Sequence, residues 1–144
     1  MYRAIVKVYS KSKDGGAALS ANFKVLEFAC RDGSDTVFVS PDLVEVLQEI
    51  REHFGKPVTI SSGYRTESYN KKVGGAAYSQ HKYGTAADIV VSGVTPLETA
   101  RYAETLLPGR GGIGLYQSFT HVDVRAARSR WDSRSGREKA VSGF

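Results

Sequence analysis

The chain has 144 residues, of which 41% are hydrophobic and 24% are charged. This composition excludes a disordered chain, and the length is that of one domain with a buried core. The net charge of +5 favours an anionic partner, and the single cysteine, Cys30, excludes an internal disulfide and a metal site built from thiolates alone.

No stretch of the sequence has the length and apolarity of a signal peptide or a membrane span. We therefore expect a protein that is made in the cytoplasm without a signal peptide, does not insert into membranes and is a monomer. We expect one domain over 1–144, with a core at about 20–131 and a basic, flexible tail at 132–144.

Capping signals predict three helices. Ser40 and Pro41 begin a helix whose apolar residues recur at helical spacing until Gly55. A short helix is predicted from Thr66 to about Val73, and a capping box at Thr95 begins a third helix that ends near 107.

Short apolar or alternating runs predict strands at 57–62, 86–91, 112–116 and 118–125. Together with the helices, these runs indicate an α+β fold with a small, mostly antiparallel sheet and helices packed on it. Alternation over the last run places four residues on one face of its strand: Phe119, His121, Asp123 and Arg125. A polar face on a central strand requires an explanation.

Two histidines and an aspartate could explain the polar strand face as part of a metal site. His81 lies seven residues before Asp88, and Gly84 allows a tight turn between them. Together with His121, they give two imidazoles and a carboxylate, a set that suits one tetrahedral Zn²⁺ with a fourth position left for water. Taken alone, the spacing of His81 and Asp88 is weak support, but histidine is scarce here, and the third one, His53, falls near the end of a predicted helix.

Two further residues could complete a hydrolytic site. Asp123, two residues beyond His121 on the same strand face, could act as the base that takes a proton from water. It could instead orient a ligand histidine or pair with Arg125. Arg65 follows a predicted strand and could stabilise a developing oxyanion or bind a peptide carboxylate, although it could also clamp loop carbonyls.

Five motifs occur in order along the chain: SGYRT (62–66), NxxVGG (70–75), SxHxxGxAxD (79–88), GGIGLY (111–116) and HVDVR (121–125). Their order and spacing resemble those of the zinc D-alanyl-D-alanine carboxypeptidase and phage endolysin family, the LAS-type peptidoglycan metallopeptidases. The resemblance covers about residues 20–131.

The resemblance implies an α+β fold like that of hedgehog and D-Ala-D-Ala peptidases, with a zinc site at the sheet. It implies one zinc ion held by His81, Asp88 and His121, and a peptidoglycan stem peptide as substrate. Arg65 would contact the substrate or the oxyanion, and Ser79 would line the substrate site. Many relatives carry an acidic residue three positions before the last histidine, where this chain has Ser118, so the role of Asp123 as a base rests on geometry alone.

The leading hypothesis is therefore zinc-dependent hydrolysis of peptidoglycan stem peptides by a D,D-carboxypeptidase or an endopeptidase, either as a phage endolysin or as a bacterial wall-trimming enzyme. The missing export signal favours release to the cell wall through a separate, phage-type pore. The alternative is an inactive, metal-stabilised module that binds cell-wall polymer. Specific nucleic-acid binding is not expected, because it would rest on charge alone.

Overall fold

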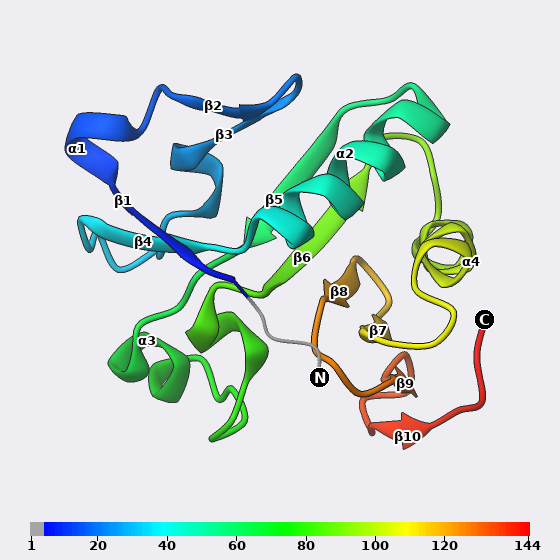
Figure 1. Ribbon diagram of the computed structural model, residues 1–144. Helices are drawn as coiled ribbons and strands as arrows, with labels where there is room; N and C mark the ends of the chain where they lie inside the picture. The colour runs from blue at the N-terminus through cyan, green and yellow to red at the C-terminus, as the bar shows by residue number, and fades with distance from the viewer. Residues whose placement is uncertain (1–4) are drawn as a thin grey trace.

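A six-stranded sheet forms the centre of the computed structural model, which describes residues 5–144 (Figure 1). The strands follow the order β10-β9-β7-β8-β6-β5 across the sheet. Their bounds are β5 (Val58–Ser62), β6 (Ala86–Val91), β7 (Gly112–Leu115), β8 (Thr120–Asp123), β9 (Ser129–Asp132) and β10 (Lys139–Ala140). The four predicted strands are confirmed as β5 to β8.

The sheet is more mixed than the predicted one. Its neighbouring strands are antiparallel except β7 and β9, which are parallel. The chain passes from β7 to β8 and then returns to the other side of β7, so β9 runs in the same direction as β7. Alternation within a strand does not report which strands become neighbours, so this pairing could not be read from the sequence.

Two small antiparallel sheets accompany the central one. One pairs β1 (Lys7–Ser10) with β4 (Thr36–Val39), and the other pairs β2 (Ala18–Ser20) with β3 (Phe23–Lys24). Short helices connect these strands: α1 (Lys11–Asp14) and the 3₁₀ helix η1 (Val25–Phe28). None of these elements was predicted, because each is only two to four residues long, and β1 and β4 in addition depend on pairing with each other across the segment between them.

All three predicted helices are confirmed. Helix α2 (Pro41–Phe54) begins after Ser40, whose hydroxyl accepts a hydrogen bond from the Leu43 amide, and ends at Gly55 with φ of 62°. Helices α3 (Glu67–Lys72) and α4 (Pro96–Leu106) begin after threonine caps at Thr66 and Thr95. The side-chain oxygens at these caps satisfy backbone amides of the first turn that have no partner within the helix.

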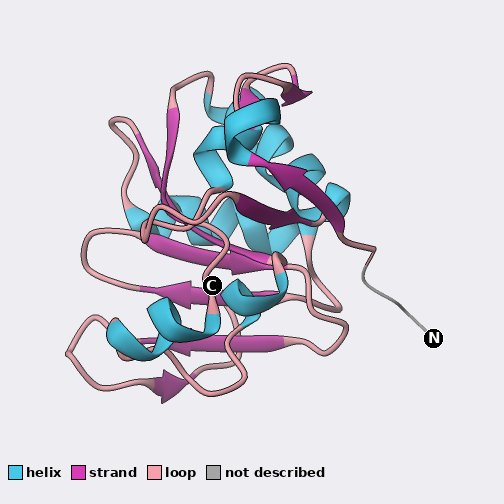
Figure 2. Cartoon of the chain, turned by 90° about the vertical axis from the view of Figure 1, so that its left-hand side faces the viewer, coloured by secondary structure: helices cyan, strands magenta, loops and turns pink. Residues whose placement is uncertain are grey.

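Helices α2 and α4 pack on one face of the central sheet, and Figure 2 shows the same layers from the side. Leu43, Leu47 and Ile50 of α2 are fully buried there, as are Ile89 of β6 and Val122 of β8. Since side chains alternate along a strand, Asp88 and His121 lie on the opposite face. The apolar core thus fixes the orientation of both strands and leaves the second face for polar side chains.

The segment 132–144 begins in β9 and contains β10, which pairs with β9. At its end Phe144 packs against the core, and its amide donates a hydrogen bond to Glu104. The flexibility expected for this segment concerns motion and stays a prediction. Among residues 5–144, no helix combines the length and the hydropathy that crossing a membrane requires.

Candidate metal centre

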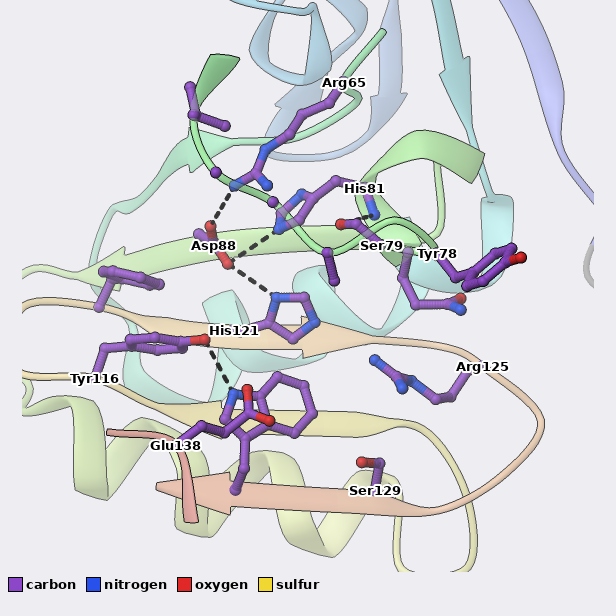
Figure 3. A pocket seen from close by; sticks show the side chains of 17 residues that line it. Arg65, Tyr78, Ser79, His81, Asp88, Tyr116, His121, Arg125, Ser129 and Glu138 are labelled. Atoms are coloured by element: carbon purple, nitrogen blue, oxygen red, sulfur yellow. Dashed lines mark hydrogen bonds and ion pairs between the residues drawn. The ribbon is translucent and has the colours of Figure 1, made fainter. Parts of the chain in front are cut away.

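His81, Asp88 and His121 converge on the sheet face opposite the helices (Figure 3). Asp88 of β6 and His121 of β8 are direct cross-strand partners, and His81 comes from the 3₁₀ helix η2 (Gln80–Tyr83) that precedes β6. One ligand atom from each residue lies within 4.8 Å of the other two. The structure therefore brings together the three residues that the sequence proposed as ligands.

Gly84 makes the turn from η2 into β6 possible. Its φ of 72° is a left-handed conformation that side chains disfavour, and a Cβ at this position would collide with the backbone of Phe38. Only glycine therefore fits without strain. The turn carries His81 back over β6, so that its ring faces Asp88.

The contacts of the two imidazoles direct one nitrogen of each ring at Asp88, and these two nitrogens are the candidate metal ligands. The Nδ1 of His81 lies 2.8 Å from the Gly63 carbonyl oxygen, to which it donates, so Nε2 carries the lone pair. The Nε2 of His121 lies 2.8 Å from Asp123, so Nδ1, which lies 3.0 Å from Asp88 Oδ1, is the nitrogen that would have to give up its proton to bind a metal. Partners on the far ring nitrogen are the usual arrangement of metal-binding histidines.

Distances between the ligand atoms fit a zinc ion. Asp88 Oδ1 lies 3.3 Å from His81 Nε2 and 3.0 Å from His121 Nδ1. Ligands about 2.0–2.1 Å from a tetrahedral Zn²⁺ are roughly 3.4 Å apart, so the carboxylate is already close to the required distance from both imidazoles. Two imidazoles and one carboxylate are also a donor set that catalytic zinc uses.

The two histidines differ in their affinity for protons. Burial lowers the pKa of His81. Burial also lowers the pKa of His121, but hydrogen bonds with Asp123 and Asp88 outweigh it and raise the pKa to about 9. Burial raises the pKa of Asp88, but its hydrogen bonds to the two histidines outweigh burial and hold the pKa well below the usual range. Asp88 is therefore a carboxylate, ready to bind a cation.

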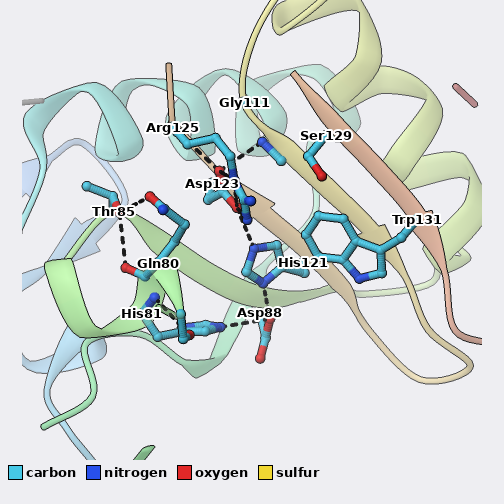
Figure 4. A network of polar contacts seen from close by, with 12 residues as sticks. Gln80, His81, Thr85, Asp88, Gly111, His121, Asp123, Arg125, Ser129 and Trp131 are labelled. Atoms are coloured by element: carbon cyan, nitrogen blue, oxygen red, sulfur yellow. Dashed lines mark hydrogen bonds and ion pairs between the residues drawn. The ribbon is translucent and has the colours of Figure 1, made fainter. Parts of the chain in front are cut away.

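Asp123 is fully buried behind His121 (Figure 4). Its carboxylate accepts hydrogen bonds from the Gly112 amide at 2.8 Å and from the Arg125 side chain at 2.6 Å, in addition to its contact with His121. These partners outweigh burial, which raises the pKa of Asp123, and hold that pKa well below its usual range. The sequence left three roles open for Asp123, and the carboxylate makes the contacts that orienting His121 and pairing with Arg125 require.

Arg65 lies on the other side of Asp88. Its Nη2 is 3.4 Å from Asp88 Oδ2, and its remaining contacts are with Ser62 and Asn70. The guanidinium group thus touches the carboxylate oxygen that is not directed at the histidines, and it also lines the cavity in front of the site. Ser79 lines the same cavity, where its hydroxyl caps η2 by accepting a hydrogen bond from the His81 amide.

The cavity in front of the three ligands has a volume of about 620 Å³. Aromatic side chains form much of its wall: Tyr78, Tyr116, Phe119 and Trp131. None of the four was predicted from the sequence to belong to the site. Among the described residues that line the cavity, the carboxylates are Asp88 and Glu138. Glu138 was missed because it lies in the segment that the sequence presented as a basic tail.

One row of residues across the sheet explains how Trp131 reaches the site. Ser62, Asp88, His121, Gly114 and Trp131 are successive cross-strand partners from β5 to β9. A Cβ on Gly114 would collide with the indole of Trp131, so glycine leaves room for the ring to lie 5.0 Å from the imidazole of His121. The glycines of GGIGLY indicate that a neighbouring group lies close to this strand. The sequence does not identify Trp131 as the residue that fills the space beside Gly114.

The fold and the site together define a candidate metal centre on the sheet of an α+β fold, beside a cavity of about 620 Å³. The family model for Peptidase M15 matches residues 21–123, which is most of the chain. The chain belongs to the Peptidase M15 family, and the family predicted from the five motifs is confirmed.

Two curated relatives indicate the chemistry found in similar proteins. The chain is 39% identical to the zinc D-Ala-D-Ala carboxypeptidase of Streptomyces albus G over 83 residues, which are 53% of this chain and 31% of that protein. It is 33% identical to the peptidoglycan L,D-endopeptidase MepK of Escherichia coli (strain K12) over 99 residues, which are 62% of this chain and 53% of that protein. The chain thus spans between about a third and about half of the length of these relatives.

Proposed function

We propose that this protein is a zinc-dependent peptidase that hydrolyses peptide bonds in peptidoglycan stem peptides. The observation that carries the proposal is the convergence of His81, Asp88 and His121 at the cavity, with one ligand atom of each within 4.8 Å of the other two. The names of the two relatives, a D-Ala-D-Ala carboxypeptidase and a peptidoglycan endopeptidase, support the substrate class.

The three ligands would hold one Zn²⁺, which in such a site polarises a carbonyl group and lowers the pKa of water. The role of the protein is to keep the ligands fixed in geometry and charge state. Gly63 fixes the His81 tautomer through a carbonyl oxygen, and Asp123 fixes that of His121 through a carboxylate. We assign Asp123 this positioning role because its oxygens are occupied and it has no exposed surface.

Arg65 would serve both the site and the substrate. Its contact with Asp88 Oδ2 holds that carboxylate in place and keeps Oδ1 directed at the histidines. Its position in the cavity wall also lets the guanidinium donate to a peptide carboxylate or to a carbonyl oxygen that gains charge. Ser79, beside His81 in the same wall, would contact the peptide backbone.

Hydrolysis also requires a group that takes a proton from water and delivers it to the leaving amine. We assign this role to Glu138. Among the described residues that line the cavity, it is the carboxylate that is not a proposed metal ligand. It lies on the hairpin from β9 to β10, on the side of the cavity where Tyr116 and His121 lie (Figure 3). Its exposure leaves it free to turn toward a bound peptide.

The test is mass spectrometry of muropeptides released from purified peptidoglycan by zinc-loaded protein. We expect the wild type to release fragments whose masses identify the bond as D,D, L,D or L-alanyl-D-glutamate, and Asp88→Ala to release none. The control variant Asp132→Asn changes a partly exposed residue of β9 and should behave as the wild type. If the wild type binds zinc and sediments with peptidoglycan but releases nothing, the binding-module alternative holds instead.

Action on the bacterial cell wall follows from this substrate. For the cellular setting we propose phage-type release, and the test is expression in bacteria with and without a separate pore-forming protein. Lysis that requires both would support it, whereas activity on the wall without the pore would favour a bacterial trimming enzyme. We further propose a monomer, for which light scattering should give about the chain mass of 15.7 kDa.

A further inference from the structure

Tyr116 and Trp131 form a hydrogen-bonded pair in the cavity wall. Tyr116 directly follows β7, and its ring stacks on Phe119 with centroids 4.3 Å apart and an interplanar angle of 13°. The indole Nε1 of Trp131 lies 3.0 Å from the Tyr116 hydroxyl oxygen. Stacking on one side and a hydrogen bond at the tip therefore hold the phenol in one orientation.

The chemistry of this pair fixes the direction of the hydrogen bond. An indole nitrogen donates and cannot accept, so the tyrosine oxygen must be the acceptor. The hydroxyl proton then points elsewhere, and within residues 5–144 the hydroxyl makes no other hydrogen bond. Since Tyr116 lines the cavity, a bound molecule can receive that proton as a hydrogen bond.

The pair is part of the metal-site architecture. Trp131 occupies the end of the row that contains Asp88 and His121, and the space for its ring exists because residue 114 is glycine. Figure 3 shows the Tyr116 hydroxyl directed toward the region where Asp88 and His121 meet. A phenylalanine would pack as well as Tyr116 on Phe119, so packing does not account for the hydroxyl.

We propose that Tyr116 is a catalytic residue that donates a hydrogen bond to the scissile carbonyl oxygen as this oxygen gains negative charge. The inference rests on the proposed peptidase function. The proton stays on Tyr116, so the residue stabilises charge without changing its own protonation state. Trp131 is a positioning residue, because its N–H occupies the tyrosine oxygen and directs the proton at the substrate.

The decisive variant is Tyr116→Phe, which keeps the ring and removes the donor. We expect kcat to fall by roughly 10²- to 10³-fold, the usual effect of losing one oxyanion donor, while KM changes by less than about twofold. Trp131→Phe should lower kcat less, by up to about tenfold, because the tyrosine donor remains but is no longer oriented. Tyr102→Phe is the matched control and should keep the wild-type kcat, since Tyr102 stacks on His53 and is not among the residues that line the cavity.

A binding measurement separates charge stabilisation from a structural defect. A phosphinate peptide carries negative oxygens in the tetrahedral geometry of the intermediate, and calorimetry should show that Tyr116→Phe weakens its binding by about the factor lost in kcat/KM. Affinity for the unreacted D-amino-acid peptide and the zinc content should stay at wild-type values.

Three outcomes would overturn the inference. The first is a Tyr116→Phe protein with wild-type kcat and phosphinate affinity, and the second is a change in KM alone. The third is a zinc-loaded wild type that hydrolyses no peptide, which would remove the proposed function and this role together. If the wild type hydrolyses peptide and Tyr116→Phe does so equally well, the proposed function stands and only the role of Tyr116 is contradicted.

Discussion

Two Asp-x-Arg segments end β8 and β9, the strands on either side of β7, with the same local hydrogen bonds. At the end of β8, Arg125 donates its amide and side-chain N–H groups to Asp123, with Nη2 2.6 Å from Oδ2. At the end of β9, Arg134 does the same to Asp132, with Nη2 2.8 Å from Oδ2. Asp123 has no exposed side-chain surface, whereas the side chains of Asp132 and Arg134 are 23% and 50% exposed.

The difference shows what converts a common surface motif into part of a metal site. Asp123 lies between the small cross-strand partners Ala86 and Gly112, so its carboxylate is enclosed, and it has a third partner in His121. Asp132 has no histidine partner among the described residues and stays in contact with solvent. Burial and the histidine, rather than the Asp–Arg pair itself, distinguish the first segment and support the positioning role proposed for Asp123.

Removing the histidine should abolish the distinction between the two segments and have the largest effect. We expect His121→Ala to lose its bound zinc and all hydrolysis, because the remaining two ligands do not close the site. Metal analysis after reconstitution measures this. The control is His53→Ala, since His53 stacks on Tyr102 in a different part of the molecule and its loss should leave one zinc per chain. Full zinc retention by His121→Ala would contradict the ligand assignment.

Changing one carboxylate at a time should sharpen the comparison. Asp123→Asn removes the charge that orients His121, and we expect zinc affinity to fall about 10- to 100-fold, as is usual for such partners of metal ligands. Asp132→Asn makes the same chemical change in the exposed segment and should leave affinity unchanged. Competition with a chromophoric chelator gives both values, and equal affinities for the two variants would show that Asp123 does not act through His121.

The charge on His121 should make zinc binding depend on pH. With its pKa raised to about 9, the metal-free imidazole is protonated at neutral pH and must lose a proton to bind zinc, while the pKa of His81 is lowered. We therefore expect affinity to rise about tenfold per pH unit up to pH about 9. Calorimetry in buffers of different ionisation enthalpy should detect release of about one proton at pH 7. A pH-independent affinity between pH 7 and 9 would contradict this assignment.

The smallest expected effect is on the free energy of unfolding, which should differ between substitutions of Arg125 and Arg134. Arg125→Gln removes the guanidinium group from the buried Asp123 and leaves His121 as its charged partner, and we expect the free energy of unfolding to fall by about 2–3 kcal/mol, less than for a fully buried pair because Arg125 is 30% exposed. Arg134→Gln breaks a pair that solvent already screens and should have no measurable effect. Urea denaturation of the metal-free proteins tests this, and equal losses would mean that burial does not set the strength of these pairs.

The sequence predicted the parts of the site that depend on local rules. Capping residues located the helices, alternation placed His121 on the polar face of β8, and Gly84 between His81 and Asp88 indicated the turn that brings these two together. These features require only near neighbours in the chain. They did not by themselves join His121 to the other two proposed ligands, a step that rested on the scarcity of histidine and on the resemblance of the five motifs.

The sequence did not predict what depends on pairing between distant strands. Trp131 reaches His121 because β9 lies parallel to β7 opposite Gly114, and nothing within either strand specifies that pairing. Alternation put Asp123 on the same face as His121, but it could not show that small cross-strand partners would enclose the carboxylate instead of leaving it open to the cavity. Glu138 was missed because β10 is only two residues long.

The central claim is that His81, Asp88 and His121 bind one zinc ion at the cavity. A crystal structure of the zinc-loaded protein, with anomalous diffraction collected at the zinc edge, tests it most directly. We predict one strong peak about 2.0–2.1 Å from His81 Nε2, His121 Nδ1 and a carboxylate oxygen of Asp88. A map without a peak there, or with zinc held by other residues, would contradict the account.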